Sequence, residues 1–183
     1  MRRLVFMLLA TALLMFLGGC TKRGAVSAAR DACSLVSKEE VESIQAAPVN
    51  ETKTSEHSDG GFLVSQCFYS GAEFNKSVTL ALLRSDPKQA STRSPKDFWK
   101  EKFDPYWDEE PKINSGDEKE PGSPPKKIEG LGDDAYWVGN RLGGMLYVLK
   151  GDAFISIGVG GTDDPESKLK KSKALAEKAL QRL

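Results

Sequence analysis

The first nineteen residues constrain the fold most, because they predict a segment that is removed from the mature protein. Met1-Arg2-Arg3 gives a positive start, and residues 4–17 carry no charge and consist mainly of Leu, Met, Phe, Val and Ala. A positive start, an apolar stretch of this length and small residues before a cut are typical of a secretory signal peptide. The apolar stretch is shorter than the ~20 residues that a spanning helix needs. We therefore expect residues 1–19 to be a signal peptide, and an uncleaved transmembrane anchor is the less favoured alternative.

The end of this segment is more specific than an ordinary signal peptide. Leu17-Gly18-Gly19-Cys20 resembles the lipobox of bacterial lipoprotein precursors. The resemblance implies that signal peptidase II cuts before Cys20 and that Cys20 carries diacylglycerol with acyl chains such as palmitate. Each methylene buried in a bilayer contributes about 0.8 kcal/mol, so several chains anchor a protein firmly. The expected location is therefore lipid-anchored and outside the cytoplasm, on the cell membrane or on an outer membrane.

Composition after cleavage is that of one ordinary domain. Removing residues 1–19 leaves 183 − 19 = 164 residues, with 26 − 2 = 24 basic side chains against 26 acidic ones. That length suits a single core. The nearly balanced, mixed charge argues against a nucleic-acid partner and against a polybasic membrane patch. Residues 20–30 are small and polar and predict a flexible tether, followed by one domain over residues 31–183.

Two cysteines, Cys33 and Cys67, remain in that domain. An exported protein meets an oxidising compartment, where an even pair is most simply a disulfide. Two free thiols or a metal pair are the alternatives. A metal site needs further His or Cys ligands, and His57 is the only histidine. We expect a disulfide and no metal.

Helix-start signals and apolar runs predict an α+β domain. Ser37 with Glu40 has the form of a capping box, Ser94-Pro95 starts a second helix, and Asp164-Pro165 starts a third. The expected helices cover residues 38–46, 95–103 and 165–183, and the expected strands cover residues 62–69, 77–83, 135–138, 145–149 and 153–159. Residues 50–61 are polar and predict a loop, and the charged Pro-rich residues 104–127 predict an exposed excursion. The expected architecture is one antiparallel β-sheet of about five strands with helices packed on one face.

Catalytic chemistry is not evident in the sequence. His57 lies in a polar stretch without a second base, so no Ser/His/Asp or Cys/His triad can be assembled. Asp133-Asp134 and the acidic run at 108–110 lack the alternating oxygen spacing of a calcium loop and predict solvated turns. Gly158–Gly161 precedes a helix, but Asp163 and Asp164 would repel an anion there. We expect no enzyme activity and no cofactor.

An aromatic cluster is the feature that most favours binding. It contains Phe98, Trp99, Phe103, Tyr106 and Trp107. These side chains could line a groove for an apolar ligand or a partner protein, or the helix could simply bury its aromatic side on the sheet. Burial is favoured for Phe98 and Trp99, and the two alternatives are balanced for Tyr106 and Trp107. The candidate binding residues are Tyr106, Trp107, Phe98 and Trp99.

Two motifs together resemble a known group of proteins. Ala32–Val41 followed by Cys67-Phe68-Tyr69, and Gly130–Tyr136 followed by a Leu-Tyr-Val strand and a Lys-Gly-Asp turn, are similar to small bacterial lipoproteins grouped as a domain of unknown function. The resemblance implies pairing of Cys33 with Cys67 and an envelope location, but no mechanism. The favoured hypothesis is a non-enzymatic envelope lipoprotein that binds another envelope component. A carrier of a small apolar ligand is one alternative, and a secreted hydrolase is another, although its triad or metal site is missing.

Overall fold

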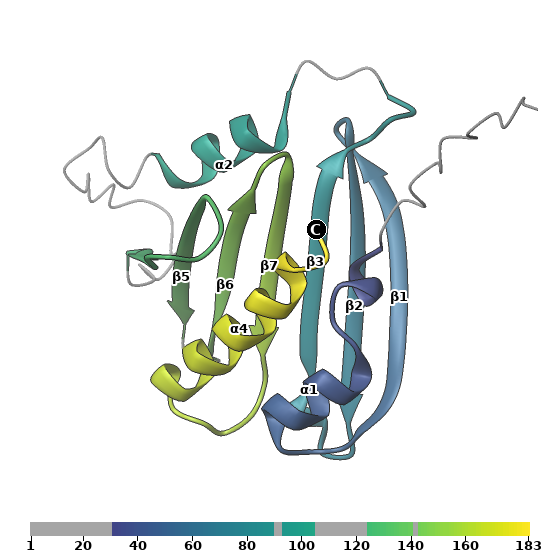
Figure 1. Ribbon diagram of the computed structural model, residues 1–183, viewed down its shortest axis with the longest axis vertical. Helices are drawn as coiled ribbons and strands as arrows, with labels where there is room; N and C mark the ends of the chain where they lie inside the picture. Colours follow the sequence, from purple (N-terminus) through teal and green to yellow (C-terminus); the bar gives the residue numbers. More distant parts are fainter. Residues whose placement is uncertain (1–30, 90–92, 105–123, 141–142) are drawn as a thin grey trace, which may run out of the picture.

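A single antiparallel sheet forms the centre of the molecule. The computed structural model describes residues 31–89, 93–104, 124–140 and 143–183. Seven strands follow the order β1-β2-β3-β7-β6-β5-β4, with every neighbouring pair antiparallel (Figure 1). The strands are β1 (Val49–Asp59), β2 (Phe62–Gly71), β3 (Val78–Ser85), β4 (Lys126–Lys127), β5 (Asp134–Asn140), β6 (Gly143–Lys150) and β7 (Ala153–Val159). The predicted α+β class with one antiparallel sheet is confirmed, but the prediction of about five strands is wrong.

The two strands that were not predicted lie at the two edges of the sheet. The predicted loop over residues 50–61 is in fact most of β1, which pairs with β2 over nearly its whole length. Its sequence has no apolar residue after Val49, and all its later side chains are exposed. An edge strand with both sides in solvent needs no apolar alternation, so its sequence resembles that of a loop. β4 has only two residues, both of them lysines.

The helices begin where the capping signals predicted. In α1 (Lys38–Gln45), Ser37 accepts a hydrogen bond from the Glu40 amide while Glu40 accepts one from the Ser37 amide. Ser94 and Asp97 form the same reciprocal cap on α2 (Pro95–Phe103). Asp164 accepts from the first-turn amides of α4 (Pro165–Leu180). Two short 3-10 turns, η1 (Ala32–Ser34) and η2 (Phe74–Lys76), complete the elements of the described residues.

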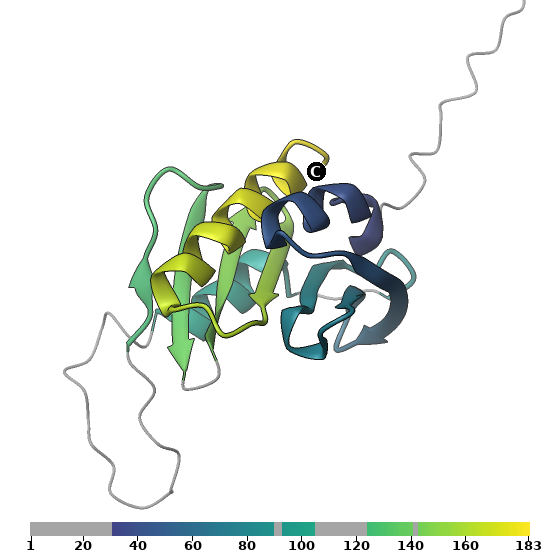
Figure 2. The same cartoon turned by 90° about the horizontal axis from the view of Figure 1, so that it is seen from below.

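Helices lie on both faces of the sheet, which corrects the prediction of one face. Figure 2 shows α1 and α4 on one side and α2 on the other. Alternate residues of each strand separate accordingly: Leu146 and Val148 of β6 belong to the core beneath α1 and α4, whereas Tyr147 and Leu149 pack with α2. Helical periodicity shows which side of a helix is apolar, but it does not show which face of a sheet that side covers.

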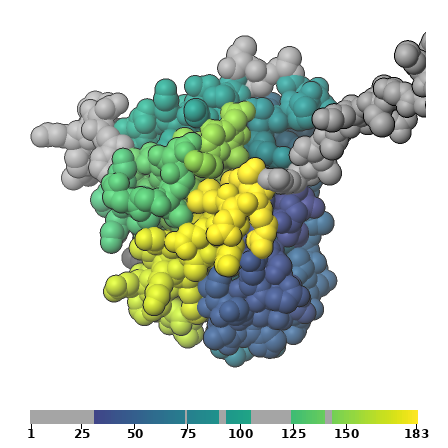
Figure 3. All heavy atoms as spheres, viewed as in Figure 1, coloured from purple at the N-terminus to yellow at the C-terminus, as the bar shows by residue number. Residues whose placement is uncertain are grey.

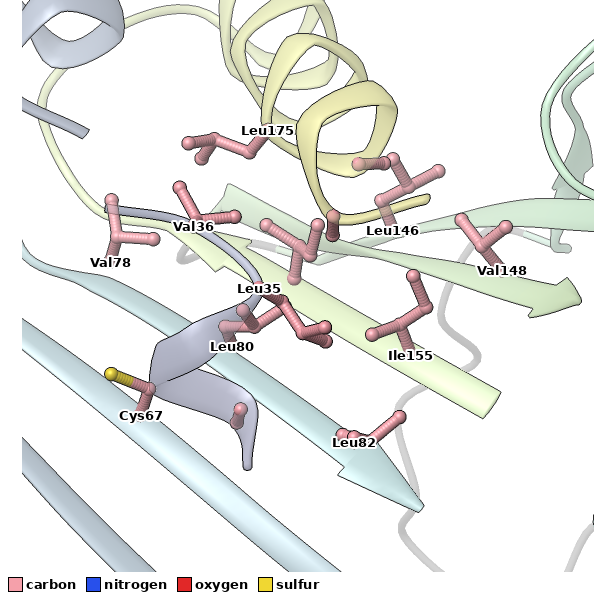
Figure 4. Close-up of a cluster of buried hydrophobic side chains, with 14 of the residues drawn as sticks. Leu35, Val36, Cys67, Val78, Leu80, Leu82, Leu146, Val148, Ile155 and Leu175 are labelled. Carbon is pink, nitrogen blue, oxygen red and sulfur yellow. The ribbon is translucent and has the colours of Figure 1, made fainter. Parts of the chain in front are cut away.

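We call the side beneath η1, α1 and α4 the covered face. Its core is mostly aliphatic, and Leu82, Leu146 and Ile155 are completely buried (Figure 4). α1 and α4 touch each other, and together with η1 they spread over this side (Figure 3). Arg182 at the end of α4 holds Glu40 of α1 through paired hydrogen bonds of 2.8 and 2.9 Å. The central strands of the covered face are therefore buried beneath three elements, and the Arg182 contact ties the end of α4 to α1.

Candidate binding surface

On the opposite side, which we call the α2 face, α2 is the helix of the described residues that covers the sheet. Trp99 and Phe103 of α2 are buried, with 4% and 1% of their surface exposed. The Phe103 ring stacks on Tyr136 at a centroid distance of 4.7 Å, and the Trp99 ring meets Phe154 edge-on at 5.4 Å. The Trp99 indole N–H donates to Asp134 at 3.1 Å. These contacts make a second, aromatic core in which Trp99 is a structural residue.

Positive side chains border this aromatic core. Arg93 lies over the Phe98 ring at 5.0 Å and forms an ion pair with Glu101. Lys102 lies over the Tyr147 ring at 4.9 Å. Cations above aromatic faces contribute about 0.5–1 kcal/mol each at exposed sites. Of the two candidate binding residues on α2, Phe98 is half-buried and Trp99 is buried. Only Phe98 therefore has side-chain surface available for binding.

Beyond α2, the sheet presents a partly exposed strip that we call the bare patch. Strand pairing aligns Phe68, Thr79, Gly158 and Met145 in one row across β2, β3, β7 and β6. The neighbouring row contains Ala81 and Ser156. All members are half-buried, and none is fully covered. The bare patch consists of Val64, Phe68, Thr79, Ala81, Met145, Ser156 and Gly158.

The shape of the bare patch follows from the sizes of its side chains. Its middle is built from small residues on β3 and β7, whereas Phe68 and Met145 stand on either side. A Cβ added to Gly158 would lie 3.2 Å from the Met145 Cε, which shows that this methionine lies across the glycine. The small side chains rise less far above the sheet than the apolar ones on either side. A complementary apolar surface can therefore pack between the larger side chains.

The predicted disulfide between Cys33 and Cys67 is present, with an S–S distance of 2.03 Å. Cys67 is fully buried in the covered-face core, and Cys33 belongs to η1. Next to it, the Ala32 amide donates to the Ser65 hydroxyl at 2.9 Å. The two contacts fix the first described turn of the chain to β2.

The acidic candidate Asp133 has structural partners. Asp133 accepts from the Lys150 amine at 2.9 Å and from the Gly151 amide at 2.7 Å, and these donors hold the pKa of its carboxyl below the usual range. His57 is exposed on β1 rather than in a loop. Within the ranges that the structure describes, no three His, Cys, Asp or Glu side chains gather where they could share a metal ion. Cys20, Tyr106 and Trp107 lie outside the described residues.

One buried titratable group lies in the covered-face core. Burial raises the pKa of Tyr69 to about 12, and its hydroxyl donates to the Val36 carbonyl at 2.5 Å. The void beside it, between Leu80 and Leu175, has no room for a water molecule. Tyr69 is therefore a neutral packing residue, and this void cannot hold a ligand.

Comparison with protein-family models, curated proteins and solved structures finds no match. None of the helices in the described part of the chain is both long and apolar enough to cross a membrane. The sequence had drawn attention to the aromatic residues around α2. It missed the bare patch, because Thr79, Ala81, Ser156 and Gly158 carry no signal until β3 pairs with β7.

Proposed function

We propose that this chain is a lipid-anchored lipoprotein of the cell envelope whose domain binds another envelope protein and catalyses no reaction. The observation that carries the binding role is the bare patch, a half-exposed strip of apolar and small side chains beside α2, on a sheet whose other face is buried over its central strands. Partly exposed apolar surface bordered by polar groups often marks an interaction site. Lys53 and Gln66, both exposed, lie along its border.

The anchoring role is supported by the N-terminal sequence and by the way the domain starts. The lipobox-like Leu17–Cys20 precedes residues 20–30, which in extended form reach at most about 40 Å. The domain then begins at η1, which the disulfide attaches to the central sheet. A domain held this close to a bilayer would meet other envelope proteins rather than molecules far from the membrane.

Binding through the bare patch can be tested by placing a photoreactive amino acid at Ala81, in the middle of the strip. A matched probe at exposed Lys170 on α4 samples the covered side of the same protein. Irradiated membranes should give one protein-sized adduct from position 81 and none from position 170. Phe68→Ala should weaken that adduct without unfolding the domain. Equal adducts from both positions, or an adduct that is insensitive to Phe68→Ala, would contradict the binding proposal. An adduct of small-molecule mass would favour the carrier alternative.

Anchoring is tested separately, by metabolic labelling with a fatty acid. The wild-type chain should incorporate label and lose its signal peptide, whereas Cys20→Ala should remain an unlabelled precursor. A Cys33→Ala variant is the matched control, because it removes another cysteine and leaves the lipobox intact. Labelling that survives Cys20→Ala would contradict the anchor.

A further inference from the structure

The two edges of the sheet differ in how they are protected. β4 has two residues, and both are exposed lysines, a short and charged edge of the kind that avoids pairing with other strands. β1 has eleven residues, and every side chain after Val49 is exposed. No strand of the described residues lies beyond β1. Its outer row of backbone N–H and C=O groups is therefore available to another strand.

We propose that β1 pairs with β1 of a second copy of this chain, antiparallel and across a twofold axis normal to the sheet. Such an axis reverses the strand direction and keeps the two faces of each sheet on the same sides. Because side chains alternate between faces, a residue then faces a residue of the same odd or even numbering. Seven strands of each copy would join in one continuous sheet. This inference goes beyond the proposed function and does not involve the bare patch.

Charge selects the register of the pairing. β1 is regular over residues 51–59, after an irregularity between Val49 and Glu51. An axis at Lys53 would face this lysine with its own copy, and an axis at Glu56 would do the same with a glutamate. An axis at Ser55 would face Glu51 with Asp59 at two symmetric places. Like charges directly opposite each other destabilise a strand pair.

An axis at Thr54 places no like charges directly opposite each other. Thr54 then faces Thr54 of the second copy, a favourable cross-strand pair. Lys53 faces Ser55, and Glu51 faces His57. Axes at Thr54, Ser55 and Glu56 each pair at least seven of the nine regular residues of β1, and among these three registers only the Thr54 axis has no like charges opposite each other. Axes at Thr52 or His57 also avoid like charges, but each pairs at most five of those residues.

Cysteine cross-linking tests the position of the axis in membranes that contain the full-length protein. Thr54→Cys would place two thiols across the axis, at the Cα separation of about 4.5–5.5 Å found in antiparallel pairs, which suits a disulfide. Thr52→Cys is the matched control, because it is also an exposed threonine on the same side of β1. The control thiols would be about 14 Å apart, since four residues separate them along the strand. Mild oxidation should give a reducible dimer from Thr54→Cys only. Equal dimer bands, or none, would overturn the proposal.

Charge substitutions at Ser55 provide a second, independent readout. In the proposed register Ser55 faces Lys53 twice, so Ser55→Glu should tighten the dimer and Ser55→Lys should weaken it, each by about tenfold. With the axis at Ser55 instead, both substitutions would weaken it equally. Sedimentation of the detergent-solubilised full chain over a range of concentrations measures the dissociation constant. A monomer at all concentrations would overturn the proposal, including the case in which another strand occupies the β1 edge.

Discussion

The two faces of the sheet each carry a hydrophobic core, but the two cores differ in their side chains and in the elements that cover them. The covered face buries aliphatic side chains beneath η1, α1 and α4. A disulfide joins η1 to β2 of the sheet, and the pair of Glu40 with Arg182 joins α1 to the end of α4. The α2 face buries aromatic rings beneath α2, and the bare patch beside them is half-exposed. The comparison shows that stability and recognition can be assigned to opposite sides of one sheet, because adjacent residues of a strand point to opposite faces.

The largest expected loss of stability comes from a substitution on the α2 face. Trp99→Ala should lower the free energy of unfolding by about 4 kcal/mol, because it removes a large buried ring and leaves a cavity. Trp99→Phe keeps most of the packing and loses the hydrogen bond to Asp134, so we expect a cost of about 1 kcal/mol. Urea unfolding of both variants measures the difference. A small change in the free energy of unfolding of Trp99→Ala would mean that α2 does not form a second core on this face. The sheet would then have one core only, on the covered face.

The disulfide gives the next largest effect, and it acts on the covered face alone. The bridged residues are 34 apart in sequence, and closing a loop of that size stabilises a fold by about 3–4 kcal/mol in the chain-entropy treatment. The double variant Cys33→Ala and Cys67→Ala should lose most of this in urea unfolding. Wild-type protein unfolded with a reductant present should show the same loss. An unchanged midpoint in either experiment would contradict the prediction.

A matched pair of valines compares the two faces directly. Val148 is completely buried on the covered face, whereas Val64 is half-buried in the bare patch. Val148→Ala should cost about 2 kcal/mol, from lost transfer free energy and a residual cavity. Val64→Ala should cost less than about 1 kcal/mol, because much of its surface is already in water. Equal costs in urea unfolding would mean that the bare patch belongs to the core.

Much of the fold follows from local signals in the sequence. Ser37, Ser94 and Asp164 are short polar residues placed just before helical segments, and each of them does cap a helix. Apolar runs predicted the strands that have at least one buried face. β1 could not be found this way, because its pairing with β2 uses backbone groups and its side chains pack against nothing that would impose an apolar pattern.

The candidate site was predictable only in part. Phe98 and Trp99 are adjacent in sequence and therefore visible as a cluster, but only their angular positions on α2 decide that Trp99 is buried and Phe98 half-buried. The bare patch depends on the pairing of β3 with β7, which are far apart in sequence. Pairing between strands so far apart in sequence is determined by the whole fold. A local pattern of small residues therefore could not predict the bare patch.

The smallest effect, and the one with a distinctive pH dependence, concerns the rim of the covered face. The Arg182 guanidinium donates two hydrogen bonds to Glu40 and lowers the pKa of that carboxyl from 4.5 to about 2. Because the folded pKa lies below the unfolded one, the stabilisation is complete above pH 4.5 and is lost as the pH falls toward 2. About a fifth of the Glu40 side chain is exposed, so screening limits the contribution to about 1–2 kcal/mol.

Glu40→Gln should therefore be less stable than wild type by that amount at pH 7, and the difference in stability should disappear near pH 2. Glu177→Gln, at an exposed position of α4 close to Arg182 in sequence, is the control and should change little at any pH. A gap between Glu40→Gln and wild type that stays constant across the titration would mean that packing of the side chain, not its charge, joins α1 to α4.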